Sequence, residues 1–174
     1  QGLYPDPEII VINPIRTVYD EDLTGYMYGG CINTGLTKIA GQFNKLRLNI
    51  DETEGYYNSG VLLMNLSELR WEIQEEDIHQ YIREHKTELL LPDQDILNGL
   101  CGTRIKPLDD SLYNYSVNHY ETYRMASAGK MDVDWVLEHT AILHFRGKIK
   151  PWMKQSRSRF SILYRHYAAM ADRA

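Results

Sequence analysis

The chain has few cysteines and no long apolar run, and each scarcity excludes a class of protein. Among 174 residues only Cys31 and Cys101 are cysteines, and their spacing matches no metal-binding motif. We therefore expect two buried thiols in a reducing compartment and predict a cytoplasmic protein. The longest apolar runs, such as residues 61–64, are far too short to cross a bilayer.

An excess of positive charge is also missing. The chain has 19 Lys and Arg residues against 24 Asp and Glu residues, so its net charge of −5 gives no support to a nucleic-acid partner. The hydrophobic share of 43% is that of an ordinary globular protein. A chain of this length can bury a sizeable core, and we expect a single domain over residues 1–174.

Strand-like and helix-like apolar patterns alternate along the chain, which predicts an α/β fold with a mixed sheet and flanking helices. We expect strands at residues 9–12, 26–32, 60–65, 105–108 and 141–145. We expect helices at residues 36–48, 68 onward, 76–85, 93–100, 132–138 and 158–171. Ser67 is the predicted N-cap of the second helix.

Two later segments carry further expectations. Residues 111–131 have weak periodicity and predict a long loop over the sheet, of the kind that often binds ligands. The last helix is predicted to be amphipathic, and it would bury one apolar face made of Phe160, Leu163, Tyr164, Tyr167 and Met170.

The segment from His144 to Trp152 combines residue types that suit a metal-bound diphosphate. A neutral imidazole can bind a metal, as His144 would. A glycine such as Gly147 allows close approach of the backbone to an anion, and a lysine supplies a positive charge suited to phosphate. An ordinary strand end remains open as the alternative.

Three other polar groups have a functional and a structural interpretation. Asp6 and Glu8 precede a strand and could share a divalent cation, or they could be solvated surface charges. The amide of Asn58 could both donate to and accept from a sugar hydroxyl, or it could form an Asx turn. Asp93 and Gln94 lie in the first turn of a predicted helix, where the helix dipole favours an acidic side chain, so they could simply stabilise the helix. Asp-Gln-Asp contains more polar groups than capping requires, so they could instead face a ligand.

Four motifs occur along the chain: Asp-Pro-Glu at residues 6–8, Tyr-Tyr-Asn-Ser-Gly-Val-Leu-Leu-Met-Asn at 56–65, Pro-Asp-Gln-Asp-Ile-Leu-Asn at 92–98 and His-Phe-Arg-Gly-Lys-Ile-Lys-Pro-Trp at 144–152. In this order they resemble the motifs of glycosyltransferase family 8. The resemblance covers nearly the whole chain. It implies the GT-A fold and a retaining, Mn²⁺- or Mg²⁺-dependent transfer of a hexose from a UDP-sugar donor. The acceptor would be a carbohydrate or lipid-linked saccharide, as in lipopolysaccharide biosynthesis.

The resemblance also implies roles for individual residues. Asp6, Glu8 and His144 would bind the metal, and Gly147 and Lys150 would contact the diphosphate. The donor sugar would be held by a separate group of polar side chains, namely Asn33, Asn58, Asp93 and Gln94. Of these, Asp93 and Gln94 would be catalytic, with Gln94 near the anomeric carbon.

The sequence departs from the family pattern near its start. The family usually has an aspartate where Glu8 stands and an aliphatic residue where Pro5 stands. The nucleotide-binding portion that precedes the metal motif in the family is absent here, so we expect an N-terminally truncated sheet whose exposed edge favours a homo-oligomer. Two alternatives remain open: a non-catalytic fragment or interaction module that has lost donor binding, and a sugar-nucleotide hydrolase.

The segment of the last predicted helix, at residues 157–173, carries several arginines. Arg157, Arg159, Arg165 and Arg173 could contact an anionic membrane surface near lipid-linked acceptors. The alternative, which we favour on sequence alone, is that this helix packs on the sheet through its tyrosines.

Overall fold

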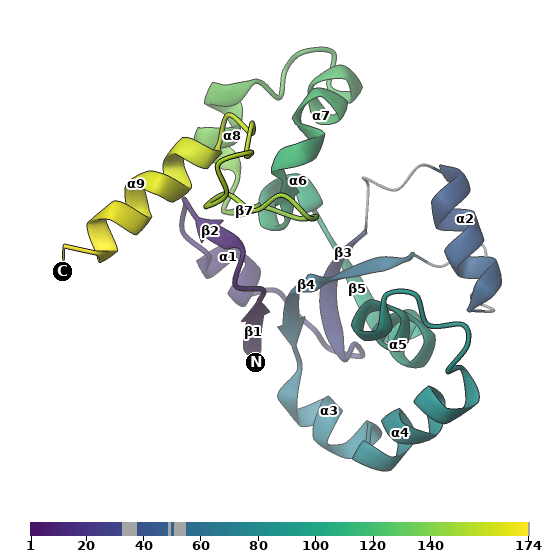
Figure 1. Cartoon of the computed structure of the whole chain (residues 1–174). Coiled ribbons are helices and arrows are strands. Elements are labelled where there is room, and N and C mark those ends of the chain that lie inside the picture. Colours follow the sequence, from purple (N-terminus) through teal and green to yellow (C-terminus); the bar gives the residue numbers. More distant parts are fainter. Residues whose placement is uncertain (33–37, 49, 51–54, 174) are drawn as a thin grey trace. The chain divides into compact units, whose positions relative to one another are not determined.

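The computed structural model describes residues 1–32, 38–48, 50 and 55–173 (Figure 1). The chain divides into two compact units. Unit 1 contains Gln1–Pro5 and Arg16–Asp110, and unit 2 contains Asp6–Ile15 and Ser111–Ala174. The prediction of a single domain stays a prediction.

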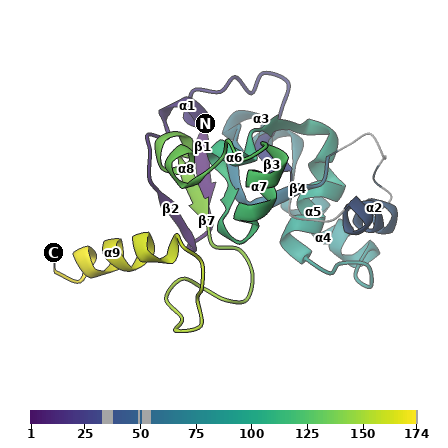
Figure 2. The ribbon, with the colours of Figure 1, turned by 90° about the horizontal axis from the view of Figure 1, so that it is seen from above.

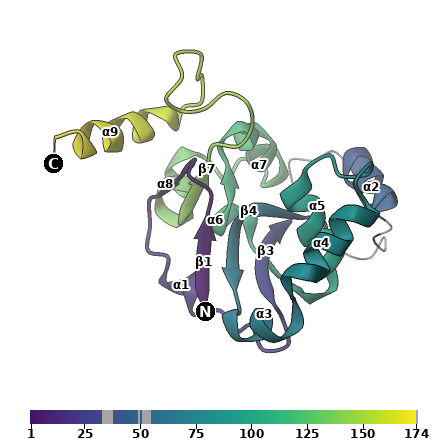
Figure 3. The ribbon, with the colours of Figure 1, turned by 60° about the horizontal axis from the view of Figure 1, so that its bottom comes forward.

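Unit 1 is built on a four-stranded mixed sheet with the order β1-β4-β3-β5, and Figure 3 shows β1, β4 and β3 side by side. Its strands are β1 (Gly2–Pro5), β3 (Tyr28–Ile32), β4 (Tyr57–Met64) and β5 (Ile105–Leu108). β4 pairs antiparallel with both β1 and β3, whereas β3 and β5 are parallel. Pro5 lacks a backbone donor, and it is tolerated because β1 lies at the edge of this sheet.

The helices of unit 1 are α1 (Arg16–Tyr19), α2 (Lys38–Arg47), α3 (Leu66–Glu72), α4 (Glu75–Glu84) and α5 (Pro92–Cys101), followed by the 3₁₀ turn η1 (Gly102–Arg104). α5 packs against β4 and α4. The core between α5 and the sheet is apolar and contains Met27, Tyr57, Leu62, Leu97, Cys101 and Ile105. Cys31 and Cys101 are buried free thiols, as expected, while the reducing compartment stays a prediction.

Two boundaries in unit 1 differ from the prediction for physical reasons. The Asn98 side chain accepts from the backbone N–H of Tyr57 and donates to its carbonyl, and β4 starts at Tyr57 rather than at Gly60. Asn65, not Ser67, caps α3, because its side-chain oxygen accepts from the N–H of Glu68. The N-cap prediction was therefore wrong by two residues.

Unit 2 contains a three-stranded sheet with the order β2-β7-β6, and Figure 2 labels its strands β2 and β7. β2 (Ile9–Val11) is antiparallel to β7 (Ile142–His144), which is parallel to β6 (Tyr115–Ser116). The helices α7 (Tyr120–Ala126), α8 (Val133–His139) and α9 (Ser161–Ala171) belong to this unit, with the 3₁₀ turn η2 (Val117–His119). The short α6 (Asp110–Tyr113) also belongs to it, except for its first residue, which is part of unit 1. None of the helices described is long and apolar enough to cross a membrane. Its core is lined by buried aromatic and aliphatic side chains, namely Ile10, Tyr115, Val117, Tyr120, Tyr123, Val136, Leu143, Phe145 and Phe160.

The prediction of a long loop over residues 111–131 was wrong. The segment contains α6, β6, η2 and α7. Tyr115 and Tyr123 stack with their ring centroids 4.4 Å apart in the core, so the tyrosines pack the unit rather than line a loop. Each element is too short to give a clear apolar period, which is why the sequence pattern failed to show it.

The last helix was also only partly predicted. It begins at Ser161, and Phe160, Leu163 and Tyr164 pack on the core as expected. Tyr167 is 45% exposed and Met170 is 53% exposed, so these two residues do not extend the buried face.

Candidate metal and diphosphate site

Unit 2 brings Asp6, Glu8 and His144 together, as the sequence predicted. One ligand atom from each lies within 4.8 Å of the other two. The Nε2 atom of His144 lies 3.7 Å from a carboxylate oxygen of Asp6 and 3.8 Å from one of Glu8. The β2–β7 register explains this proximity, because Ile9 lies opposite His144 and the backbone N–H of Phe145 donates to the carbonyl of Glu8.

His144 is held as a neutral imidazole with a free lone pair. It is 1% exposed, and its Nδ1 lies 2.7 Å from the side-chain oxygen of Asn114. An amide oxygen can only accept, so Nδ1 carries the proton and Nε2 does not. Burial, then Arg146 and Lys150, lower the pKa of His144 to about 3, which keeps the ring neutral at physiological pH.

The Nε2 atom of His144 has no hydrogen-bond partner within the described residues and faces two carboxylates. A buried lone pair directed at two anionic groups is unfavourable unless a cation lies between them. Two carboxylates and one imidazole form a donor set that suits a divalent metal such as manganese. The three residues therefore fit a metal ion, and the longer side chain of Glu8 still reaches the cluster.

Lys150 and Gly147 lie on the loop that follows β7. The ammonium group of Lys150 forms an ion pair with the Glu8 carboxylate. Gly147 has a φ of +96°, a backbone conformation that residues with a Cβ atom rarely adopt. The side-chain amide of Asn118 donates to the carbonyl of Arg146 at 2.5 Å, which holds this loop beside η2. The loop thus places a positive charge next to the cluster of Asp6, Glu8 and His144.

Asn114 is a positioning residue that the sequence reasoning missed. It precedes β6 in a segment predicted to be a loop, and no motif marked it. We expect Asn114→Ala to weaken manganese binding about 10- to 100-fold, because it releases the ring orientation and tautomer of His144. Asn114→Asp keeps an acceptor for Nδ1–H and should restore most of the affinity in a metal titration. Equal losses in the two folded variants would contradict this role.

A second group of polar side chains lies in unit 1, where β4 begins and α5 begins. The amide of Asn58 donates to the side-chain oxygen of Gln94 at 2.8 Å, and the hydroxyl of Ser59 donates to Asp93 at 2.8 Å. Gln94 is 4% exposed, and its Nε2 has no hydrogen-bond partner among the residues described. Asn33, the fourth predicted sugar contact, lies outside the described residues.

Asn58 also satisfies the structural interpretation of its motif. Its side-chain oxygen accepts from the backbone N–H of Gly60 at 3.1 Å, in the manner of an Asx turn. The same side chain therefore shapes the start of β4 and holds Gln94. Asn58, Asp93 and Gln94 are brought together, and Ser59, to which the sequence analysis assigned no role, joins them.

Asp95 explains why the Asp-Gln-Asp motif has a second acid. Its carboxylate is fully buried and accepts from both terminal nitrogens of Arg47, at 2.8 and 3.1 Å. The Tyr56 hydroxyl donates to it at 2.6 Å, and the backbone N–H groups of Leu90 and Leu91 donate at 2.7 and 2.8 Å. Asp95 therefore joins α2, the start of β4 and the start of α5, which is a structural task that Asp93 and Gln94 do not share.

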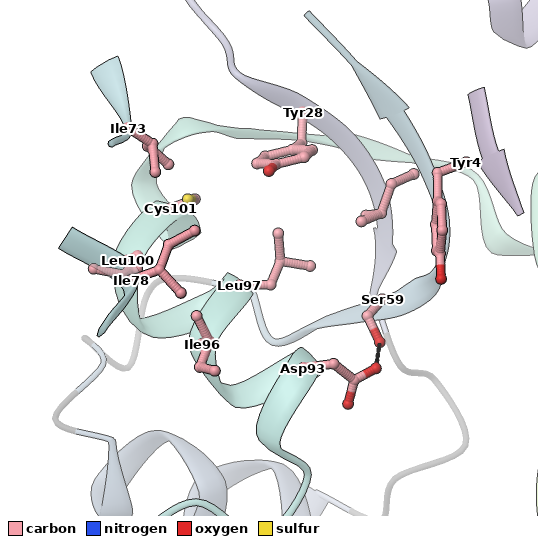
Figure 4. A pocket seen from close by; sticks show the side chains of 11 residues that line it. Tyr4, Tyr28, Ser59, Ile73, Ile78, Asp93, Ile96, Leu97, Leu100 and Cys101 are labelled. Atoms are coloured by element: carbon pink, nitrogen blue, oxygen red, sulfur yellow. Dashed lines mark hydrogen bonds between the residues drawn. The ribbon is translucent and has the colours of Figure 1, made fainter. Parts of the chain in front are cut away.

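A cavity of about 250 Å³ in unit 1 lies beside the Ser59–Asp93 pair (Figure 4). Apolar side chains of α5 and the sheet form most of its walls, among them Ile96, Leu97 and Leu100. The hydrogen-bonded Ser59 and Asp93 lie at one side of it, and Tyr28 and Cys101 lie away from them.

The chain has an α/β fold of the GT-A type. The chain is similar to the solved structure of the galactosyltransferase LgtC in complex with donor and acceptor sugar analogs, at 22% identity and a TM-score of 0.79. That match covers 97% of this chain and 60% of LgtC. GlyE of Streptococcus pneumoniae TIGR4 matches with a TM-score of 0.70 at 21% identity, over 95% of this chain and 38% of that one. The expected α/β fold with mixed sheets and flanking helices is confirmed.

The chain belongs to glycosyl transferase family 8, whose sequence model matches residues 2–156. General stress protein A of Bacillus subtilis is 28% identical over 95% of this chain and 57% of its own length. A putative glycosyltransferase of Haemophilus influenzae is 24% identical over 89% of this chain and 44% of its own length. The chain thus spans about half the length of these two curated relatives.

Proposed function

We propose that this chain is the part of a family 8 glycosyltransferase that binds the metal, diphosphate and sugar of the donor. The donor in this proposal is a UDP-hexose, the metal is Mn²⁺ or Mg²⁺, and the hexose is transferred with retention to a carbohydrate or lipid-linked saccharide. A cytoplasmic location and a role in lipopolysaccharide or a similar glycan are part of the same proposal.

The unpartnered Nε2 of His144 carries the proposal. It is buried, it faces Asp6 and Glu8, and Lys150 lies on the same carboxylate of Glu8. A divalent cation would remove the repulsion among these groups, and a diphosphate would provide the anion that Lys150 and the metal together attract. A sugar nucleotide carries both a diphosphate and sugar hydroxyls, which suit the polar side chains of unit 1.

The residues have separate tasks in this reaction. When bound, the metal would supply Lewis-acid polarisation of the leaving diphosphate. Lys150 stabilises the negative charge that develops on that leaving group, and the backbone at Gly147 allows its close approach. Asp93 and Asn58 hold sugar hydroxyls. The amide of Gln94 is a poor nucleophile, so attack by the acceptor on the same face as the departing diphosphate is more natural than a double displacement.

Replacing Lys150 should weaken diphosphate binding without unfolding the chain. We expect Lys150→Ala to lower the affinity for UDP in the presence of manganese about tenfold, because a charge-assisted hydrogen bond is lost. Lys148→Ala removes the same charge two residues away, where the side chain is exposed, and should change the affinity less than about threefold. Calorimetric titration measures both, and equal effects would contradict a specific role for Lys150.

Replacing Gln94 should affect turnover more than donor binding. For Gln94→Ala we expect a roughly 10- to 100-fold lower kcat with donor affinity changed only a few fold, since the amide acts near the reacting carbon. The measurement is the rate of hexose transfer at saturating donor, compared with donor affinity from titration. Equal losses in both quantities would assign Gln94 to binding alone.

The reaction itself is tested by supplying a UDP-hexose, manganese and a saccharide acceptor. Sugar-linked product that forms only with acceptor, with the anomeric configuration of the donor, supports transfer. Release of free hexose at the same rate with and without acceptor would favour the hydrolase. Absence of donor binding in a folded chain would favour the non-catalytic module.

A further inference from the structure

The side-chain amide of Asn58 has a fixed orientation. Its Oδ1 atom accepts from the backbone N–H of Gly60 at 3.1 Å, and a backbone N–H can only donate. The oxygen of the Asn58 amide must therefore face Gly60, and its Nδ2 atom must face away from it. Nδ2 lies 2.8 Å from the side-chain oxygen of Gln94. The Asx turn at the start of β4 thus determines which end of the Asn58 amide meets Gln94.

The amide of Asn58 in turn fixes the amide of Gln94. An N–H group needs an acceptor, and Oε1 is the acceptor that a glutamine side chain has. Oε1 of Gln94 therefore faces Asn58, and Nε2, which carries two N–H bonds, is the other branch of the amide. The reversed orientation would place N–H groups of Asn58 and Gln94 against each other and leave both donors unpaired, which is unfavourable.

The backbone of Gln94 is fixed as well. The side chain of Asn98 accepts from the N–H of Tyr57 at 2.6 Å, and it donates to the carbonyls of Tyr57 and Gln94 at 2.8 and 2.7 Å. Asn98 is 2% exposed, so these bonds lie inside unit 1 and join the start of β4 to α5. Because its backbone carbonyl and its Oε1 are both held, Gln94 can reverse its amide only by breaking the bond from Asn58.

The Nε2 atom of Gln94 is a buried donor without a partner. Gln94 is 4% exposed, and its Nε2 forms no hydrogen bond within residues 1–32, 38–48, 50 and 55–173. Buried N–H groups are normally paired, and an unpaired one is unfavourable. An oxygen of a bound ligand would supply the missing acceptor. The preceding residue, Asp93, has the complementary chemistry, because an ionised carboxylate only accepts.

We propose that Asn58 is a positioning residue that fixes the amide of Gln94, and that Gln94 donates a hydrogen bond from Nε2 to a hydroxyl oxygen of the donor hexose. The identity of the ligand rests on the proposed function, whereas the orientation of the amide rests on contacts within unit 1 alone. A hydroxyl oxygen has lone pairs that accept from an N–H group. The positioning task uses one of the two N–H bonds of Asn58, so it is compatible with the sugar contact proposed above.

Nuclear magnetic resonance of the isotope-labelled chain without ligand tests the orientation of the amide. We expect a scalar coupling across the hydrogen bond from Nδ2 of Asn58 to the side-chain carbonyl carbon of Gln94. The bonds from Nδ2 of Asn98 to the carbonyls of Tyr57 and Gln94 have the same chemistry and similar lengths, so their couplings are internal controls. Spectra that show the Asn98 couplings without the Asn58 coupling, or a coupling from Nε2 of Gln94 to the side-chain carbonyl carbon of Asn58, would overturn the inference.

Asn58→Asp separates the positioning task from the Asx turn. The aspartate keeps an oxygen that accepts from Gly60, but it offers Gln94 an acceptor in place of a donor, so the amide of Gln94 should turn over. We expect kcat for hexose transfer to fall about tenfold, but by less than about twofold when the same change is made in Gln94→Ala. Gln42→Glu adds the same charge at an exposed position of α2 and should leave kcat unchanged. Equal losses from Asn58→Asp in the two backgrounds would exclude positioning through Gln94.

Donors that lack one hydroxyl test the partner of Nε2. A site built to hydrogen-bond a hydroxyl discriminates against the analogue that lacks it, because the buried donor is then left unpaired. With one monodeoxy UDP-hexose, kcat/KM should therefore fall at least about tenfold further for the original chain than for Gln94→Ala. Equal losses for every deoxy donor in both chains would exclude a bond from Gln94 to a hexose hydroxyl. Absence of donor binding in a chain that shows the Asn58 coupling would contradict the proposed function and leave the amide orientation established.

Discussion

Asp95→Asn should destabilise the protein by about 3–5 kcal/mol, because it removes the negative partner of a buried ion pair and leaves the Arg47 guanidinium without compensation. The Arg47 side chain is only 10% exposed and that of Asp95 is fully buried. The substitution also weakens the hydrogen bonds from Tyr56 and from the backbone of Leu90 and Leu91. Because proteins are stable by only about 5–15 kcal/mol, the expected loss is a large fraction of the total.

Urea unfolding followed by circular dichroism measures this loss, which should appear as a midpoint lower by about 2 M. Asp93→Asn is the matched control, since Asp93 is exposed and keeps one hydrogen bond from Ser59; its effect should stay below about 1 kcal/mol. The double variant Arg47→Gln/Asp95→Asn should lose less than the two single losses added together. Equal stability of Asp93→Asn and Asp95→Asn would show that the buried pair does not hold unit 1 together.

The same carboxylate predicts a pH dependence. Burial raises the pKa of Asp95, but hydrogen bonds from Arg47, Tyr56 and the backbone lower it by more, so the net shift is downward. A lowered folded pKa contributes stability above the unfolded value of about 3.9, and that contribution is lost as the pH falls through the folded pKa. The difference in free energy of unfolding between the original chain and Asp95→Asn should therefore be constant from about pH 7 to 5, and it should shrink as the pH falls below about 4.

His144→Ala should abolish metal-dependent donor binding. It removes the imidazole from the cluster with Asp6 and Glu8, and we expect manganese affinity to fall at least about 100-fold. This loss exceeds the one expected for Asn114→Ala, which removes only the residue that orients His144. His144→Gln preserves more of the side-chain volume in a buried position and should show the same loss if the alanine variant does not fold. Manganese titration with and without UDP gives both affinities.

His139→Ala is the control for that experiment, because His139 is exposed at the end of α8 in the same unit and lies outside the cluster. It should change manganese affinity less than about twofold. Unchanged manganese affinity in a folded His144→Ala or His144→Gln variant would exclude His144 as a metal ligand.

The strands β2, β3, β4, β5 and β7 could be predicted from the sequence because the signal of a strand is local, whereas β1 and β6 were missed. The cluster of Asp6, Glu8 and His144 was predicted through the resemblance to a known family. The apolar runs at residues 9–12 and 141–145 each mark a buried strand. The position of each strand determines where the polar residues next to it lie. Glu8 and His144 come together because these two strands pair. The resemblance to a known family supplied the pairing, which no pattern within one strand contains.

The rest depended on contacts between segments far apart in the sequence. Arg47 and Asp95 are 48 residues apart, and nothing around Arg47 marks it as the partner of a buried acid. Asn114 meets His144 through the parallel pairing of β6 with β7, and β6 is only two residues long. Exposure of Tyr167 and Met170 was missed because helical periodicity shows an apolar side without showing where the core ends.

Calorimetric titration of UDP into this chain, with and without manganese, tests the central claim most directly. The account predicts binding with manganese and much weaker binding without it, because Asp6, Glu8 and His144 need the cation before Lys150 and the metal can hold a diphosphate. Absence of binding in both conditions, in a chain shown to be folded by circular dichroism, would contradict a working diphosphate site in unit 2.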